Sequence, residues 1–449
     1  MSKKLISALL ALLLSLAPAI GWAELQLDKA YQYMPSIKPI PGTGYLTMES
    51  KTDNSLGLFT TAGEEVIPYG CSAITYMNHG YFSVTKDKNA ENSLAIFRGG
   101  QQISDYQYGY ITVLDKHWIA GYVLEKTDGA ADISLNKINY LILQWDLYYV
   151  DDSAPEEGFL VASLDSQQFT QAQQHGDCIA IKDRDGAVRV YDRSFQPVNV
   201  EVSDVKSSFY RVETYQIISN ISNEVIANGY TEVAEANLPG RMLLTANTVN
   251  MAGEKVSAIL DLDGTELMPA EYTIVTMGDP YVVVANGNGQ RGLYSLDEKK
   301  LIVPCEFSNI VTCATSINPY VNNGFVCVEK DGKRGFVNAE TGEISAPLTV
   351  NSRIAKVYGS SIVFDGEDGF VLVAGDGTRT ELFDCSEIAA SNGNGTLLVA
   401  KKNGYYGIID WHGNEMLPFI HKNVITLTDD SRALIRTSTG YELDVITSY

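Results

Sequence analysis

A short phrase built around a glycine recurs along this chain of 449 residues and constrains its fold more than any other feature. The clearest copy, YYGIIDWHGNEMLP, spans residues 405–418 and places Gly407 inside an apolar, strand-like run. A polar turn precedes this run, and a turn containing glycine follows it, before a short apolar run and a proline. Internal repetition at a period of about 20 to 50 residues is typical of solenoids, propellers and other repeat arrays.

Further copies extend the repeat over most of the chain. The glycine, or a small residue in its place, recurs at Gly57, Ala258, Gly292, Gly335, Gly369 and Gly407. From Ala258 onward the steps between these positions are 34, 43, 34 and 38 residues. Weaker copies lie at 93–103, 139–150 and 186–197, and a truncated copy begins at Thr439. The chain therefore carries roughly ten units of one repeat.

The residues of each copy predict its local structure. Apolar runs on both sides of Asn-Gly or Asp-Gly, as in LLVAKKNGYYG at 397–407, indicate a β-hairpin. We expect the closing proline to end a strand, because proline lacks the N–H donor of the ladder; these prolines are Pro68, Pro269, Pro304, Pro347 and Pro418. A glycine inside a strand marks a bulge or a close backbone approach, so we interpret the repeated glycines as packing residues.

These units determine the expected architecture. A unit of three or four short strands cannot bury both of its faces alone, so neighbouring units must stack. We predict an all-β chain of tandem β-hairpin repeats of about 34–45 residues, stacked as β-propeller-like blades in one or two rings, or as an open β-solenoid. Because propellers usually have about four to eight blades, the repeat number leaves closure open.

The chain divides into four predicted segments. A signal peptide at 1–23 precedes N-terminal repeats at 24–164, degenerate repeats or an insertion at 165–240, and C-terminal repeats at 241–449. The polar stretch DSQQFTQAQQHG at 165–176 tolerates a helix, and we interpret it as an insertion or a boundary between two halves.

The repeat pattern resembles a known family. An aromatic-Gly-aliphatic-Ile-Asp strand, a turn with glycine, an apolar run and a proline are similar to the WG repeat of bacterial proteins, over about residues 45–449. The Trp before the glycine is replaced here by Leu56, Arg291, Arg334, Asp368 and Tyr406, and Ile-Asp is complete only at Ile409-Asp410. Similar proteins are mostly secreted or envelope proteins without an assigned activity. The resemblance therefore implies a repeat surface used for binding.

The first residues predict the compartment. Lys3 and Lys4 precede an apolar run from Leu5 to Leu16, and small residues follow it. This pattern indicates a secretory signal peptide cut after Ala23, with Ala19 as the second choice. No later run is long and apolar enough to span a bilayer, so we expect a secreted or extracytoplasmic protein without a transmembrane segment.

The charge balance bears on the partner. The formal net charge is -22, and loss of the two signal-peptide lysines makes it -24. Such a balance opposes binding to nucleic acid or to anionic membranes, which need clustered Lys and Arg. We expect a protein or polysaccharide partner.

Residues with reactive or metal-binding side chains are sparse. The six cysteines are expected to be mostly buried thiols, with Cys305–Cys313 and Cys313–Cys327 the pairs to check for a disulfide; the others are Cys71, Cys178 and Cys385. No two of the five histidines have metal-ligand spacing. The acidic phrases at 183–186 and 261–264 lack the further ligands of a calcium loop, so we interpret both as ordinary turns. We predict no catalytic residue, metal or cofactor.

Aromatic residues supply the candidate binding positions. Tyrosine is abundant, with 26 residues, and clusters around 106–110, 140–149 and 405–406. Exposed aromatic rings stack on sugars or pack against proteins, whereas buried ones fill gaps between repeats. We single out Trp411, Tyr405, Tyr108 and Trp145 as candidate contacts.

Three functions fit these features. The first is a noncatalytic repeat protein, secreted or at the cell surface, that binds a protein or a glycan. The alternatives are a structural component of the envelope and, less favoured, a propeller-type glycan hydrolase or lyase, which needs a facing pair of carboxyl groups.

Overall fold

The computed structural model describes residues 36–41, 43–114, 116–129, 131–151, 158–165, 169–175, 178–200, 202–238, 241–313, 319–437 and 441–446. The regular structure in these ranges consists of β-strands alone, which confirms the all-β prediction. The predicted signal peptide and its cleavage site lie outside them. Over the same ranges, no helix has the length and apolar character that crossing a membrane requires.

The described strands form eleven consecutive antiparallel units, which we number as blades 1 to 11. Blade 1 contains β1 (Ile37–Ile40), β2 (Tyr45–Glu49), β3 (Leu56–Thr60) and β4 (Glu65–Cys71). Blade 2 contains β5 (Ala73–Asn78), β6 (Tyr81–Thr85), β7 (Leu94–Arg98) and β8 (Gln101–Gln102). Blade 3 contains β9 (Tyr110–Val113), β10 (Trp118–Lys126), β11 (Ile133–Leu135), β12 (Ile138–Val150) and β13 (Gly158–Asp165).

Blades 4 and 5 have fewer strands than blade 3, and the two blades after them form one continuous sheet. Blade 4 contains β14 (Phe169–His175), β15 (Cys178–Asp183), β16 (Val188–Tyr191) and β17 (Pro197–Val198). Blade 5 contains β18 (Tyr210–Glu213), β19 (Gln216–Ser219) and β20 (Val225–Asn228). Blades 6 and 7 share one strand and contain β21 (Glu232–Leu238), β22 (Arg241–Val249), β23 (Lys255–Leu260), β24 (Glu266–Thr276), β25 (Tyr281–Ala285), β26 (Arg291–Ser295) and β27 (Lys300–Phe307).

The remaining blades repeat the same plan. Blade 8 contains β28 (Asn309–Ile310), β29 (Val321–Asn322), β30 (Phe325–Lys330), β31 (Lys333–Asn338) and β32 (Ile344–Asn351). Blade 9 contains β33 (Lys356–Tyr358), β34 (Ser361–Asp365), β35 (Gly369–Ala374) and β36 (Arg379–Phe383). Blade 10 contains β37 (Cys385–Ser391), β38 (Leu397–Lys402), β39 (Tyr405–Asp410) and β40 (Glu415–His421), and blade 11 contains β41 (Thr426–Leu427), β42 (Arg432–Arg436) and β43 (Tyr441–Val445).

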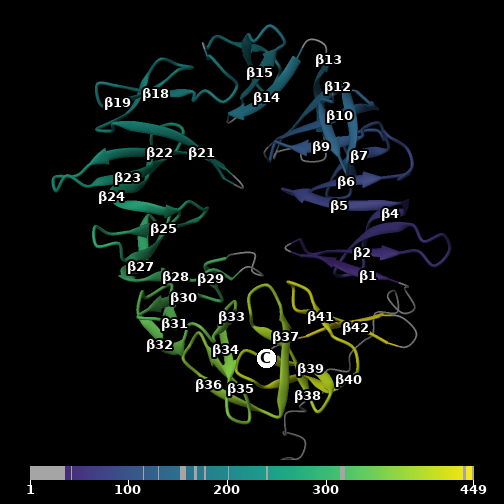
Figure 1. Ribbon diagram of the computed structural model, residues 1–449, viewed down its shortest axis with the longest axis vertical. Coiled ribbons are helices and arrows are strands. Elements are labelled where there is room, and N and C mark those ends of the chain that lie inside the picture. Colours follow the sequence, from purple (N-terminus) through teal and green to yellow (C-terminus); the bar gives the residue numbers. More distant parts are fainter. Residues whose placement is uncertain are drawn as a thin grey trace, which may run out of the picture.

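The blades follow one another around a single ring (Figure 1). Figure 1 shows β21 toward the middle of the ring and β24 toward its outer rim. Eleven hydrophobic clusters of described residues each join two successive blades. One of them unites Ile37, Leu46 and Phe59 of blade 1 with Leu434 of blade 11, and Thr61 donates a hydrogen bond to Asp430 beside it. The two ends of the array therefore pack together.

The repeated glycine lies opposite a bulge, as its position inside a strand predicts. In blade 10, Tyr406 pairs with His421 and Ile408 with Leu417, so β40 contains two extra residues opposite Gly407. A Cβ on Gly407 would lie 2.7 Å from the Leu417 carbonyl oxygen. The same contact recurs opposite bulges at Gly292 with Val303 O, at Gly335 with Ala346 O and at Gly57 with Ile67 O, whereas Gly369 approaches Leu382 O in a ladder without a register shift.

The prediction that proline ends the strand is wrong. The prolines lie inside their strands, in β4 (Pro68), β24 (Pro269), β27 (Pro304), β32 (Pro347) and β40 (Pro418). The bulge explains the difference, because its extra residues leave the ladder and need no N–H donor there.

The described part of the polar stretch at 165–176 is strand, although its sequence tolerates a helix. Asp165 ends β13, and 169–175 form β14, which pairs with β15 from Phe169↔Asp183 to His175↔Cys178. β14 pairs on one side with β15, and its Gln171 and Gln173 line a cleft described below. Blade packing thus overrides a weak local preference.

The cysteines are thiols, and neither of the two pairs considered above is bridged. Cys71, Cys313, Cys327 and Cys385 are buried. Burial raises the pKa of the Cys327 thiol to about 12, and burial likewise raises the pKa of Cys71 and Cys385. These thiols are packing residues between blades.

Candidate functional site

A cleft with a volume of about 480 Å³ lies between blades 3 and 4. One wall comes from β9, β10, β12 and the hairpin extension that carries β11, and the other from β14. The turn between β15 and β16 contributes Arg184, and the loop before blade 5 contributes Val205 and Lys206.

A row of three aromatic rings lies along the first wall. Tyr110 pairs with Tyr122 across β9 and β10, and Tyr122 pairs with Trp145 across β10 and β12. Residues opposite each other on neighbouring strands point to the same face, so their rings meet. The ring centroids of Tyr110 and Tyr122 are 5.7 Å apart, and those of Tyr122 and Trp145 are 6.2 Å apart at an interplanar angle of 8°.

Exposure falls along this row. Tyr110 is 38% exposed and Trp145 is 4% exposed, with Tyr122 between them. Burial, and then the neighbouring Tyr110, raise the pKa of Tyr122, so its phenol keeps its proton at neutral pH and remains a hydrogen-bond donor. The row lines the cleft with aromatic rings, and its two tyrosines add hydroxyl groups.

Polar side chains surround the aromatic row. Gln171 and Gln173 reach the cleft from the same face of β14, since alternate residues of a strand share a face. Asp132 closes the other end, and its Oδ2 accepts the Ile142 N–H at 2.9 Å. Amide, carboxylate and cationic groups thus lie within one cleft beside the aromatic row.

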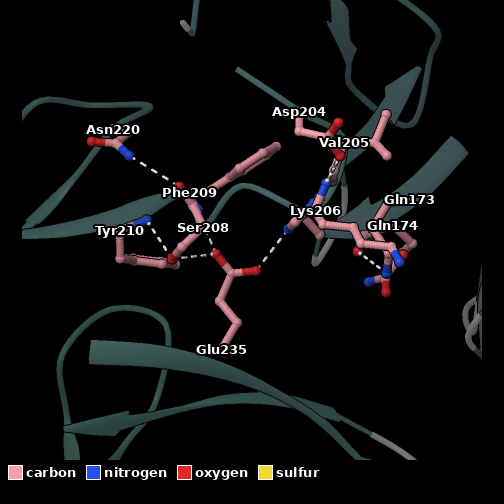
Figure 2. A network of polar contacts seen from close by, with 11 residues as sticks. Gln173, Gln174, Asp204, Val205, Lys206, Ser208, Phe209, Tyr210, Asn220 and Glu235 are labelled. Carbon is pink, nitrogen blue, oxygen red and sulfur yellow. Dashed lines mark hydrogen bonds and ion pairs between the residues drawn. The ribbon is translucent and has the colours of Figure 1, made fainter. Parts of the chain in front are cut away.

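A buried hydrogen-bond network fixes the loop behind the cleft (Figure 2). Figure 2 shows the Glu235 carboxylate of β21 directed at Ser208 and Phe209. Its Oε1 accepts hydrogen bonds from the Ser208 hydroxyl at 2.9 Å and from the Phe209 N–H. Its Oε2 lies 2.7 Å from His175 Nδ1, and His175 Nε2 lies 2.6 Å from the Val205 carbonyl oxygen. Blade 4, blade 6 and the loop before blade 5 therefore meet at this histidine.

The four predicted contact residues lie in three separate places. Tyr108 is fully buried, and its hydroxyl bonds Asp146 and Tyr148 at 2.6 Å each, so the prediction of a surface contact is wrong for Tyr108. Trp145 is a core residue whose edge reaches the cleft. The sequence does not show where β9 begins. Tyr108 lies before this strand, and its side chain points into the core.

The other two predicted contacts lie in blade 10. Tyr405 is 40% exposed at a hairpin. Trp411 is half-buried, with its ring 5.8 Å from that of Phe325 and 4.5 Å from that of His412. His412 Nε2 lies 2.8 Å from Asp376 Oδ2, which connects the turns of blades 9 and 10. Trp411 thus packs between blades, and Tyr405 remains exposed but outside the cleft.

The acidic phrases are ordinary turns, as their sequence indicates. Asp183 Oδ1 accepts the Ala187 N–H at 2.8 Å, and Asp263 Oδ1 accepts the Thr265 N–H at 2.8 Å. The carboxylates are therefore engaged by their own backbone. No group of three His, Cys, Asp or Glu side chains gathers to hold a metal ion anywhere in the described ranges.

A second cleft of about 330 Å³ surrounds Gly369 in blade 9. In blade 10 the corresponding glycine follows Tyr406, which is buried, whereas Gly369 follows the exposed Asp368. Glu367, Asp368 and Glu381 line this cleft beside Arg379. Its lining is acidic and also includes Phe364, Phe370 and Phe383.

Of the three rings of the row in the first cleft, Trp145 was singled out from the sequence, whereas Tyr110 and Tyr122 were not. Tyr110 lies in a tyrosine cluster that the sequence does show, but Tyr122 stands alone in WIAGYVLEK. The cross-strand row depends on the register of three strands, and the sequence carries no direct signal of that register. The sequence marks the glutamines of β14 only as part of a polar stretch, and this does not identify them as cleft residues.

Comparisons with known proteins do not assign a family. No family model matches the sequence, and no curated protein matches it. A eukaryotic initiation factor structure covers 83% of this chain and 95% of its own at 10% identity and a TM-score of 0.34. The computationally designed Ika8 protein matches at 12% identity over 63% of this chain and 97% of its own, with a TM-score of 0.21. The AfRom2 CNH domain matches at 12% identity over 76% of this chain and 99% of its own, with a TM-score of 0.19. At these TM-scores, none of the three supports an argument about this chain.

Proposed function

We propose that this chain is a noncatalytic binding protein that acts outside the cytoplasm and takes a glycan in the cleft between blades 3 and 4. The aromatic row of Tyr110, Tyr122 and Trp145 carries the proposal. Sugar rings present apolar C–H faces that pack on aromatic rings, and their hydroxyls need amide and carboxylate partners. Gln171, Gln173 and Asp132 supply such partners at the edges of the row.

The size of the cleft supports an oligosaccharide. A volume of about 480 Å³ falls within the range of small-molecule sites, roughly 300–1,000 Å³. The row extends across three strands that lie about 4.8 Å apart, so it spans more than one sugar ring. The proposal keeps the WG-repeat resemblance and the predicted signal peptide as further expectations, because both agree with a binding surface outside the cytoplasm.

The test is a titration of the full chain with neutral and acidic oligosaccharides of two to six sugars. Tyr110→Ala removes the most exposed ring of the row, and we expect roughly fivefold weaker binding from the loss of about 1 kcal/mol of stacking. Tyr405→Ala is the matched control, since Tyr405 is 40% exposed against 38% for Tyr110 and lies in another blade. Absence of binding to every oligosaccharide, or an equal loss in both variants, would contradict the proposal.

A glycan hydrolase is the second candidate function, and its active site would lie in the second cleft, around Gly369. Glycoside hydrolysis needs two carboxyl groups, and Glu367, Asp368 and Glu381 line that cleft, whereas Asp132 is the single carboxylate among the lining residues of the first. Release of reducing sugar from a polysaccharide, abolished by Glu381→Gln, would favour this candidate over the binding protein.

A further inference from the structure

His175 faces a hydrogen-bond acceptor at each of its two ring nitrogens. Nδ1 lies 2.7 Å from Glu235 Oε2, and Nε2 lies 2.6 Å from the Val205 carbonyl oxygen. A neutral imidazole donates from one nitrogen alone, whereas an imidazolium donates from both. The other oxygen of Glu235 already accepts from Ser208 and Phe209, which favours the carboxylate form. The proton therefore belongs to the ring, and the pair is an ion pair.

The surroundings keep this pair out of water. His175 is 8% exposed, and its ring stacks on Phe209 at 4.1 Å and 13°. A charge-assisted hydrogen bond in such a place is stronger than one at the surface, and losing it leaves a buried acceptor unsatisfied.

Other titratable groups of the neighbouring elements lie around the pair. Tyr210 of β18 has a pKa raised to about 12 by burial and then by Glu235. Asp204 and Lys206 belong to the loop, Lys182 of β15 bonds Asp204 at 2.7 Å, and Cys178 is the strand partner of His175. Glu235 is thus the one anion among these groups that bonds His175 directly.

The pair fixes one wall of the cleft. Val205 and Lys206 line the cleft, and the Val205 carbonyl is the atom that His175 holds. Gln173 lines it too, two residues before His175 on the same face of β14. The charged histidine therefore sets the position of the Val205–Lys206 loop relative to β14.

We propose that His175 is a positioning residue of the cleft, whose imidazolium holds the Val205–Lys206 wall in place, and that ligand affinity falls when His175 loses its proton. The part that concerns a ligand rests on the function proposed above.

The direction of the pH effect follows from the two partners. Burial disfavours the imidazolium, but the bonds to Glu235 and to the Val205 carbonyl outweigh it and raise the pKa of His175. Burial also disfavours the Glu235 carboxylate, but His175, Phe209 and Ser208 outweigh it and lower its pKa. The ion pair is complete between these two pKa values, is lost as pH rises through that of His175, and is lost in acid below that of Glu235.

Glu235→Gln gives a sharp test, because glutamine keeps the shape but removes the charge. Its amide N–H₂ donates to Nδ1, so a neutral His175 still donates from Nε2 to Val205. In the unmodified protein we expect oligosaccharide binding to be about fivefold to tenfold weaker at about pH 9 than at about pH 6. In Glu235→Gln the affinity stays the same between these pH values. A merely structural role would instead weaken binding at every pH.

Asp376→Asn is the matched control, because it breaks the histidine–carboxylate contact with His412 in other blades. We expect it to leave the pH profile of binding unchanged. A steep pH profile that survives in Glu235→Gln, or that disappears in Asp376→Asn, would overturn the proposal.

Two measurements need no ligand, so they separate this proposal from the proposed function. The ¹⁵N spectrum of His175 should show both ring nitrogens protonated at neutral pH, and a neutral ring would overturn the proposal. Amide exchange of 202–209, corrected for intrinsic pH dependence, should accelerate above the pKa of His175 in the unmodified protein and not in Glu235→Gln. If both hold while no oligosaccharide binds at any pH, the proposed function fails and the positioning of the loop stands.

Discussion

Single residues in this ring differ more in role than their sequence context indicates. Tyr108 and Tyr110 are two positions apart in one tyrosine cluster, yet one is fully buried and the other lines the cleft. The cluster itself was visible in the sequence, but the face of each ring depends on where β9 begins. The Tyr108 ring fills the space over Gly121, where a Cβ would lie 2.5 Å from it. That fit joins the residue two positions before β9 to Gly121 of β10, so it cannot be recognised from local sequence.

The hydroxyl of Tyr108 should stabilise the junction of blades 2 and 3. It donates to Asp146 Oδ2 at 2.6 Å, and the Asp146 side chain is almost fully buried. Tyr108→Phe removes a charged hydrogen bond, so we expect the free energy of unfolding to fall by about 1–3 kcal/mol in urea denaturation. Tyr110→Phe is the control and should change it by less than about 0.5 kcal/mol. Equal effects of the two variants would show that the Tyr108 bond to Asp146 adds nothing.

Elements were the scale at which the sequence was most informative. The hairpins, the turns at Asn-Gly and Asp-Gly and the close approach at the repeated glycine all follow from local rules. The prediction that proline ends the strand was wrong, because the missing N–H of proline is tolerated at a bulge as well as at a strand end. The pairing of Tyr406 with His421 and of Ile408 with Leu417 settles the matter for blade 10.

The bulge predicts a strong preference for glycine at 407. A methyl group there would lie 2.7 Å from Leu417 O and 2.9 Å from the Phe419 ring, and the carbonyl belongs to the backbone of β40. We expect Gly407→Ala to lower the free energy of unfolding by about 1–3 kcal/mol. Gly129→Ala is the matched control, because its nearest neighbour is the Thr127 hydroxyl at 3.5 Å and its φ is not left-handed. The unit with Ala258 accepts a methyl at this place, so a small effect at 407 would mean that the bulge adapts there as well.

At the scale of the whole molecule, the repeat predicted stacking but not closure. Stacking follows from units that cannot bury both faces alone. Whether the last unit meets the first depends on the angle between successive blades, which accumulates over eleven of them in the described chain and leaves no trace in any one repeat. The cleft depends on this scale too, since its walls belong to different blades and His175 bonds a residue 60 positions away.

Closure predicts an energetic coupling between the two ends of the chain. Phe59 of blade 1 and Leu434 of blade 11 belong to one buried cluster, so Phe59→Ala and Leu434→Ala should be non-additive. We expect a coupling of about 0.5–3 kcal/mol from a double-mutant cycle in urea, after checking that fluorescence and circular dichroism report one transition. The control cycle pairs Phe59→Ala with Leu398→Ala, which lies in the cluster between blades 9 and 10, and these should add within about 0.5 kcal/mol. Additivity in the first cycle would mean that the two end blades do not support each other, and the ring would then behave in solution as an open array.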